Sequence, residues 1–286
     1  MINRRSLRVK VLQLLFSYFN LIIQKEDKNN LQLEISKQLN KSIIDIEKYY
    51  FDIILLSITL KNINQEKKEI AKNELIKKSV TRFNLSNNTV INFLEKNSEI
   101  IDGLIKHKNS FNIKSEEIRN WYNALLNEEF YKSYVSLDNP TFDQEYEFFQ
   151  NLILKFLLKN EDITKFFEED NIFWNEDVLI VKSMIKKTLK TLNSPNFNTF
   201  ASASLSEDIK DDLKFASSLF DFVIDNSDNY DEYISKFAKN WDLERISLMD
   251  RTILKMGIGE MINFSNIPVK VSINECIEIA KNYSSP

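Results

Sequence analysis

Glycine is scarce in this sequence: Gly103, Gly257 and Gly259 are the only three in 286 residues. Loops that hold phosphates or dinucleotides need several glycines at fixed spacing, because the backbone must approach the ligand closely. The Gly257-Ile258-Gly259 stretch has part of that pattern, but the segment around it has helical periodicity. We therefore interpret the pair as a site of close helix packing, and the sequence argues against a nucleotide-dependent enzyme.

Histidine and cysteine each occur once, as His107 and Cys276. One histidine excludes multi-histidine metal sites, and no Glu-x-x-His pair of the di-metal carboxylate type is present. One cysteine cannot form an intrachain disulfide and offers too few ligands for a cysteine-based zinc site. We expect no catalysis, no metal and no cofactor, a surface position for His107 and a buried one for Cys276.

Long apolar runs are missing as well, since charged or amide residues interrupt every stretch before the roughly 20 apolar residues that a membrane span needs. The amino terminus, MINRRSLRVKVLQLLFSYF, has basic residues before an apolar stretch, as a secretory signal does. However, Lys10, Gln13 and Ser17 interrupt the stretch and no small-residue cleavage site follows. We expect no membrane contact and a cytoplasmic location.

Apolar residues recur at helical intervals along most of the chain, and strand-like alternation is hardly visible. The spacing predicts a first helix over residues 4–23. It also predicts a helix over residues 42–60 and a charged helix over residues 65–78, which we expect to form an antiparallel hairpin or part of a bundle. The predicted fold class is all-α.

Between residues 81 and 195 the sequence changes to shorter segments rich in aromatic residues. We interpret this stretch as a large helical insertion between an amino-terminal helical subdomain, residues 1–80, and a carboxy-terminal one, residues 196–286. Capping-box motifs, in which a serine or threonine and a residue three positions later satisfy free amides, predict three helix starts. They lie at residues 141–144, 204–207 and 272–275.

Arg4, Arg5 and Arg8 crowd the start of the first predicted helix, where unpaired backbone amides already carry partial positive charge. Cations there cost roughly a few tenths of a kcal/mol each, and such a local conflict points to a function. With Lys10 close by, these side chains would form a cationic tip that holds the phosphates of a single-stranded RNA. The alternative is a solvated terminus whose arginines bind nothing. Because the net charge is −4, any RNA contact must come from a local patch.

The stretch NWDLERISLMDRTILKMGIGEMINFSNIPVKVSINECIEIAKNYSSP, which begins at residue 240, resembles the signature region of the NusB family of transcription antitermination factors. The upstream stretch RRSLRVKVLQLLFSYF resembles that family's first helix. The matching residues are Arg4, Arg5, Arg8, Gln13, Trp241, Glu244, Arg245, Asp250, Arg251, Leu254, Glu260, Ile267, Pro268, Lys270, Val271, Asn274, Glu275, Ile279, Ala280 and Lys281.

The resemblance covers about residues 1–60 and 207–286, and it implies two small helical bundles of the NusB type. It further implies a factor that binds the boxA element of ribosomal RNA transcripts together with NusE, a small-subunit ribosomal protein, and that joins the elongating RNA polymerase complex. It places Arg4, Arg5 and Arg8 at the RNA-facing start of the first helix.

Lys270 and Asn274 are expected to add RNA-binding groups at the start of the last helix, after a turn that Pro268 presets. Family members usually continue with a further helix that contains a Phe-(Val/Ile)-Asn-Gly motif. We therefore expect this chain to be a fragment without that helix.

Two alternatives stay open at this point. One is a helical protein-interaction scaffold that uses the aromatic insertion to hold partners and does not bind RNA. The other is an accessory domain of a ribosomal RNA methyltransferase, which the absence of a glycine-rich cofactor loop makes the weaker of the two.

Overall fold

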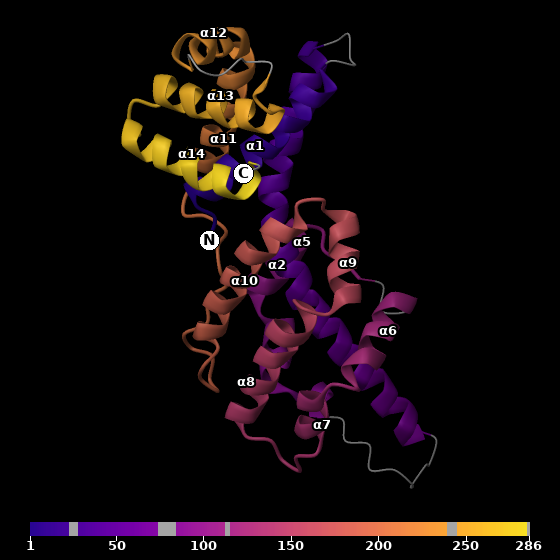
Figure 1. The fold of residues 1–286 in the computed structure, drawn as a ribbon. Helices are drawn as coiled ribbons and strands as arrows, with labels where there is room; N and C mark the ends of the chain where they lie inside the picture. The colour runs from indigo at the N-terminus through magenta and orange to yellow at the C-terminus, as the bar shows by residue number, and fades with distance from the viewer. Residues whose placement is uncertain (23–27, 74–83, 112–114, 239–244, 285–286) are drawn as a thin grey trace. The chain divides into compact units, whose positions relative to one another are not determined.

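The computed structural model describes residues 1–22, 28–73, 84–111, 115–238 and 245–284. Within these ranges the regular structure is helical throughout, without a β-strand, which confirms the predicted all-α fold class (Figure 1). The chain divides into two compact units. Unit 1 consists of Met1 and Ile46–Leu205, and unit 2 consists of Ile2–Asp45 and Ser206–Pro286.

Unit 2 is built around its first helix, α1, which contacts α11 and α13, while α14 packs along α13 (Figure 1). Leucine, valine and aromatic side chains of these helices fill the core. Its helices are α1 (Arg4–Leu21), the first part of α2 (Lys28–Asn73), α11 (Ile209–Asp225), α12 (Ser227–Phe237), α13 (Leu248–Asn263) and α14 (Val269–Tyr283). Its largest fully buried side chains include Leu7, Leu12, Leu14, Leu15 and Phe220.

Unit 1 holds the remainder of α2 and the aromatic-rich part of the chain. Among its buried aromatic side chains, Trp174 stacks on Phe167, with ring centroids 4.6 Å apart. The other elements of unit 1 are α3 (Asn84–Asn87), α4 (Thr89–Lys96), α5 (Ser98–Lys106), α6 (Glu116–Leu125), α7 (Glu129–Val135), α8 (Phe142–Asn151), the π-helix η1 (Leu152–Leu157), α9 (Glu161–Asp170) and α10 (Trp174–Thr191).

The predicted hairpin of two helices over residues 42–60 and 65–78 is wrong, because α2 is one continuous helix as far as Asn73. Residues 74–78 lie outside the described ranges. The segment where the turn was expected contains no glycine or proline that would interrupt the helix, and Ile63 and Asn64 are both buried there. The Asn64 side chain donates a hydrogen bond of 2.9 Å to the Tyr122 hydroxyl, so the polar residues expected in a turn lie inside a helix.

The surface position predicted for His107 is also wrong. Its side chain is only 5 % exposed, and Nε2 lies 2.9 Å from Oε2 of Glu47. The imidazole stacks on the Phe51 ring with centroids 5.7 Å apart. The neighbouring lysines suggested a solvated position, because the two partners of His107 lie on α2, far away in the sequence.

The compact units and the subdomains expected from the sequence are different divisions of the chain. The expected insertion, residues 81–195, lies within unit 1, but unit 1 also takes most of α2. The domain boundaries at residues 80 and 195 therefore stay a prediction. Among the described helices, none combines the length and apolarity that a bilayer crossing requires.

Local capping explains where several helices begin. Asn3 caps α1 by accepting a hydrogen bond from the Ser6 amide at 2.8 Å. The capping box predicted at residues 141–144 is confirmed at the start of α8, where Thr141 and Gln144 exchange both hydrogen bonds. The box predicted at residues 204–207 is wrong, because Asp208 caps α11 by accepting from the Asp211 amide at 3.0 Å.

The box predicted at residues 272–275 is wrong for a different reason. Helix α14 already begins at Val269, directly after Pro268, whose φ of −59° suits a helix start. Ser272 and Glu275 therefore lie inside the helix, and their side chains are free to bind partners on other helices. Those partners turn out to define the candidate site.

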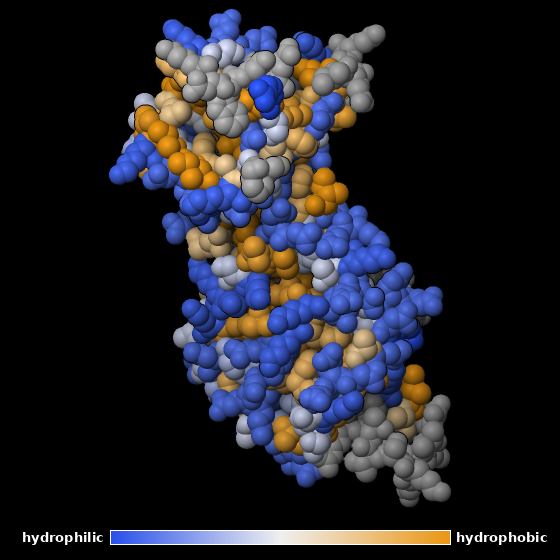
Figure 2. Space-filling model, viewed as in Figure 1, coloured by the Kyte–Doolittle hydropathy of each residue, from blue (hydrophilic) through white to orange (hydrophobic). Residues whose placement is uncertain are grey.

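Helix α14 buries only a narrow part of its surface, with Ser272 and Ile279 as its buried residues. Ile279 is 1 % exposed, whereas Ile273 and Ile277 are 45 % and 50 % exposed. Figure 2 shows apolar side chains gathered over α14 on the face in view. Cys276 is mostly buried, and burial raises the pKa of its thiol to about 11.

Both glycines of the Gly257-Ile258-Gly259 stretch lie at helix contacts, which confirms the packing interpretation. A Cβ atom on Gly257 would stand 2.8 Å from Sγ of Cys276 on α14. A Cβ atom on Gly259 would stand 3.0 Å from a methyl group of Val223 on α11 and 3.4 Å from the Tyr230 ring on α12. The missing side chains let α13 approach three neighbouring helices.

We expect Gly257→Ala to lower the urea midpoint of unfolding, because the new methyl group meets Sγ of Cys276. The same change in a Cys276→Ala background should raise the midpoint, since alanine favours a helix over glycine by about 1 kcal/mol and the sulfur is gone. Circular dichroism of all four proteins gives the coupling energy, expected at about 0.5 kcal/mol or more. Additive effects of the two substitutions would contradict this contact.

Candidate nucleic-acid interface

A groove of about 640 Å³ opens in unit 2 where α1 and α14 begin. We call it the α1–α14 groove. Its wall mixes cationic and amide side chains with aromatic and aliphatic ones, and α11 and the turn between α13 and α14 complete it. The lining residues are Asn3, Arg4, Arg5, Arg8, Asp211, Lys214, Phe215, Ser218, Phe264, Asn266, Ile267, Pro268, Val271 and Glu275.

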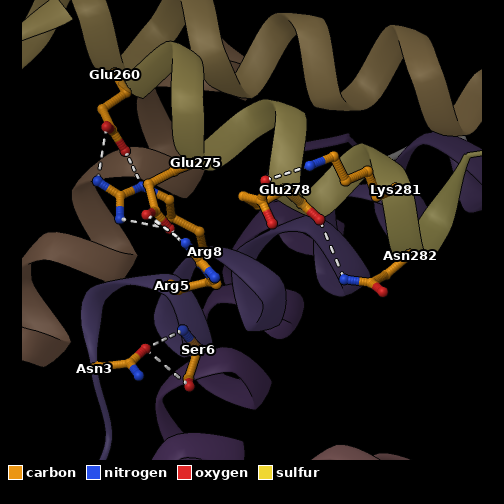
Figure 3. A network of polar contacts seen from close by, with 9 residues as sticks. All are labelled: Asn3, Arg5, Ser6, Arg8, Glu260, Glu275, Glu278, Lys281 and Asn282. Atoms are coloured by element: carbon orange, nitrogen blue, oxygen red, sulfur yellow. Dashed lines mark hydrogen bonds and ion pairs between the residues drawn. The ribbon is translucent and has the colours of Figure 1, made fainter. Parts of the chain in front are cut away.

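Arg8 lies at the base of the groove and is buried, with a side chain 3 % exposed. Its Nε and Nη2 atoms donate to the two carboxylate oxygens of Glu260 on α13 at 2.6 and 2.8 Å. Figure 3 shows this pair. The Ser272 hydroxyl of α14 donates to the same carboxylate. The buried charges are thus paired in a fork and hydrogen-bonded, which is the condition for keeping an ion pair inside a protein.

Arg5 lies at the rim of the groove, one turn before Arg8. Its Nε and Nη2 atoms donate to Glu275 on α14 at 2.7 and 2.9 Å. The hydrogen bond from Arg5 lowers the pKa of the Glu275 carboxyl below its usual value, so this carboxylate is ionised at neutral pH. The Arg5 side chain remains 51 % exposed. Figure 3 shows Glu275 between Arg5 and Arg8, and an Nη1 atom of Arg8 lies 4.0 Å from it.

Arg4 lies on the side of the groove formed by α11. Its guanidinium donates to Asp211, and Nη1 lies 3.7 Å from Oδ1 of Asp212. The same guanidinium covers the face of the Phe215 ring at 4.4 Å from the centroid, a cation–π geometry. Its side chain is 40 % exposed.

The site predicted from the sequence is therefore only partly assembled. Arg4, Arg5 and Arg8 do meet, but the expectation of three open cations is wrong, since each is paired with a carboxylate and Arg8 is buried. Lys10 is 2 % exposed, so it does not belong to an exposed tip either. Because residues two positions apart do not share a helix face, the burial of Arg8 and Lys10 means that α1 is covered on more than one side.

Lys270 and Asn274 are exposed on the first turns of α14, as expected. Neither lines the α1–α14 groove, to which α14 contributes Val271 and Glu275 instead. Lys270 and Asn274 therefore lie beside the groove, on the helix that contributes part of its wall.

Sequence reasoning missed the contribution of α11 and of the turn after α13. Lys214 is exposed at the groove, and the rings of Phe215 and Phe264 meet at 5.1 Å in an edge-to-face arrangement. No local motif singled out these residues, because their role depends on a contact with α1 about 200 residues earlier. Cations beside aromatic rings suit a strand that offers phosphates and bases together. No cluster of three or more potential metal ligands occurs in the part of the chain that the structure describes.

We expect Arg8→Met to destabilise the protein by about 3–5 kcal/mol, because it leaves the Glu260 carboxylate buried without its guanidinium. The double substitution Arg8→Met with Glu260→Met should recover most of that loss, since two apolar side chains of similar size replace the pair. Urea unfolding of the two variants beside the wild type measures both effects. A double variant as unstable as Arg8→Met would argue against the pairing.

Comparisons with known proteins address the carboxy-terminal part of the chain. The model of the NusB family matches residues 179–286. This match begins within α10, earlier than the resemblance expected from residue 207. Of the residues that carry the resemblance, Trp241 and Glu244 lie outside the described ranges.

Several curated relatives carry the name transcription antitermination protein NusB. The one from Dictyoglomus turgidum is 51 % identical over 72 residues, which is 25 % of this chain and 50 % of the relative. The one from Salinibacter ruber is 44 % identical over 72 residues, 25 % of this chain and 45 % of the relative. The one from Chloroherpeton thalassium is 40 % identical over 88 residues, 30 % of this chain and 42 % of the relative.

The chain thus spans half or less of the length of these relatives. No solved structure matches it significantly. The matched segment supplies α11, α13 and α14 of the groove, whereas α1 with its arginines lies outside it. Residues 179–286 of this chain are therefore similar to the NusB family.

Proposed function

We propose that this protein is a transcription antitermination factor that binds single-stranded boxA RNA in the α1–α14 groove. NusE binds with it, and the complex joins the elongating RNA polymerase. The names of the relatives support antitermination as the activity. The observation that supports RNA as the ligand is the set of partly exposed cations, Arg4, Arg5 and Lys214, around Phe215 and Phe264.

In this proposal the cations hold phosphates while a base stacks on Phe264, the less buried ring of the aromatic pair. Stacking of a base on an aromatic side chain contributes about 1–3 kcal/mol, and it tolerates different bases. Lys270 and Asn274 extend the polar surface along α14 for the flanking nucleotides. Sequence preference would then come from these flanking contacts, because phosphate contacts carry no sequence information.

Arg8 and Lys10 have a different role from the one expected of them. Their side chains are buried, so they do not contact RNA directly in this proposal. Arg8 instead fixes the start of α1 against α13 and α14, which positions Arg4 and Arg5 at the rim. The role is recruitment without catalysis, and it takes place in the cytoplasm, where bacterial transcripts are made.

We expect Lys214→Ala to weaken binding of a fluorescein-labelled boxA RNA and to reduce the slope of log K against log salt by about 0.7, because one phosphate contact is lost. Fluorescence anisotropy over a salt series, with and without NusE, measures both. Lys236→Ala is the matched control, since Lys236 is exposed on α12 and does not line the groove.

If Lys214→Ala binds as tightly and with the same slope as the wild type, the groove is not the RNA site. If the wild type binds NusE but does not bind boxA RNA, either with NusE or without it, the scaffold alternative is the better description.

A further inference from the structure

The exposed cations at the rim of the α1–α14 groove already have anionic partners within the chain. Glu275 occupies both donors on one edge of the Arg5 guanidinium, at 2.7 and 2.9 Å. Asp211 accepts a hydrogen bond from Nη2 of Arg4. Both carboxylates belong to the groove wall. A phosphate that enters the groove therefore meets guanidinium groups that carboxylates already hold.

We propose that Glu275 and Asp211 are built-in competitors of RNA phosphate, so that binding exchanges one ion pair of Arg5 or Arg4 for another. This inference rests on the RNA-binding role proposed above. It adds two acidic residues to the site, and they limit its affinity for any polyanion.

Burial separates the pairs that can exchange from the one that cannot. The Arg8–Glu260 pair has side chains 3 % and 2 % exposed, so a phosphate cannot reach it. Arg5 is 51 % exposed and Asp211 is 60 % exposed. The Arg4–Asp211 pair is open enough to solvent to contribute little to stability, and in the forked Arg5–Glu275 pair the guanidinium is the side that a phosphate can reach.

After the exchange, the Glu275 carboxylate still lies close to a second guanidinium, that of Arg8. Its side chain is 18 % exposed, and Oε2 lies 4.0 Å from Nη1 of Arg8 as well as 2.7 Å from Nε of Arg5. When a phosphate takes Arg5, the carboxylate keeps the nearby positive charge of Arg8. The exchange therefore leaves no isolated charge in the partly buried wall, although the carboxylate still repels the incoming phosphate.

The competition has a measurable signature in the salt dependence of binding. The slope of log K against log salt reports how many phosphates the protein neutralises. An arginine that is already neutralised by a carboxylate adds little to that number. Removing the carboxylate should therefore tighten binding and steepen the slope by up to about 0.7, the value for one contact to a single strand.

The test compares Glu275→Gln with Glu278→Gln in the full chain. Both substitutions remove one negative charge from α14, but the Glu278 carboxylate pairs with Lys281 on the same helix. Glutamine keeps the size of the side chain and one oxygen acceptor for Arg5. Using the labelled boxA RNA, we expect Glu275→Gln to bind about 2- to 5-fold tighter, the range for an exposed ion pair, with a steeper salt slope. Glu278→Gln should stay close to the wild type.

A second arm identifies the cation involved. In an Arg5→Ala background, Glu275→Gln should no longer tighten binding, because the guanidinium that it would release is gone. Asp211→Asn, at a side chain that is 60 % exposed, should tighten binding through Arg4 and provides an independent variant if Glu275→Gln is unstable.

Equal affinities for Glu275→Gln and the wild type, or an equal gain from Glu278→Gln, would overturn the competition. Failure of the proposed function looks different, since Lys214→Ala would then leave RNA binding unchanged. If Lys214→Ala weakens binding while neither acidic substitution strengthens it, RNA binding stands and the competition alone is rejected.

Discussion

The buried ion pair between Arg8 and Glu260 is the interaction on which the candidate site depends. It joins the start of α1 to α13 across 252 positions of sequence, and the Ser272 hydroxyl ties α14 to the same carboxylate. Arg4 and Arg5 precede Arg8 by four and three residues on one helix, so all three belong to neighbouring positions of its surface. Fixing Arg8 therefore determines where the other two guanidinium groups reach the rim of the groove.

The same network explains how an acidic chain can hold a cationic groove. The net charge of −4 does not describe the site, because Asp211, Glu260 and Glu275 neutralise its arginines within the chain. What remains for a ligand is the exposed part of two guanidinium groups and the ammonium of Lys214. Such a groove favours ligands that offer phosphates at the right places over those that only carry negative charge.

The groove also combines a part of the chain that matches the NusB family with a part that does not. Helices α11, α13 and α14 lie in the segment that matches the NusB family, at residues 179–286. Helix α1 lies outside that match, yet it contacts α11 and α13 within unit 2. The arginines of α1 and the acids of the matched segment are complementary, which supports one shared site for both parts.

Helical periodicity and the lack of glycine and proline were enough to predict the all-α class, the first helix and the packing role of Gly257, because these properties depend on local sequence. Local signals failed where two of them competed. Residues 272–275 match a capping box, but Pro268 starts α14 earlier, and the supposed capping side chains bind Glu260 and Arg5 instead.

The three arginines and the helix that carries them could be read from the sequence alone, whereas Lys214, Phe215 and Phe264 could not. Which of those charges are buried, and which acid holds each one, was decided only by the tertiary structure. The acidic partners of Arg4, Arg5 and Arg8 lie 207, 270 and 252 positions away. Periodicity places a side chain on a face of its own helix, but it does not tell which distant helix will cover that face.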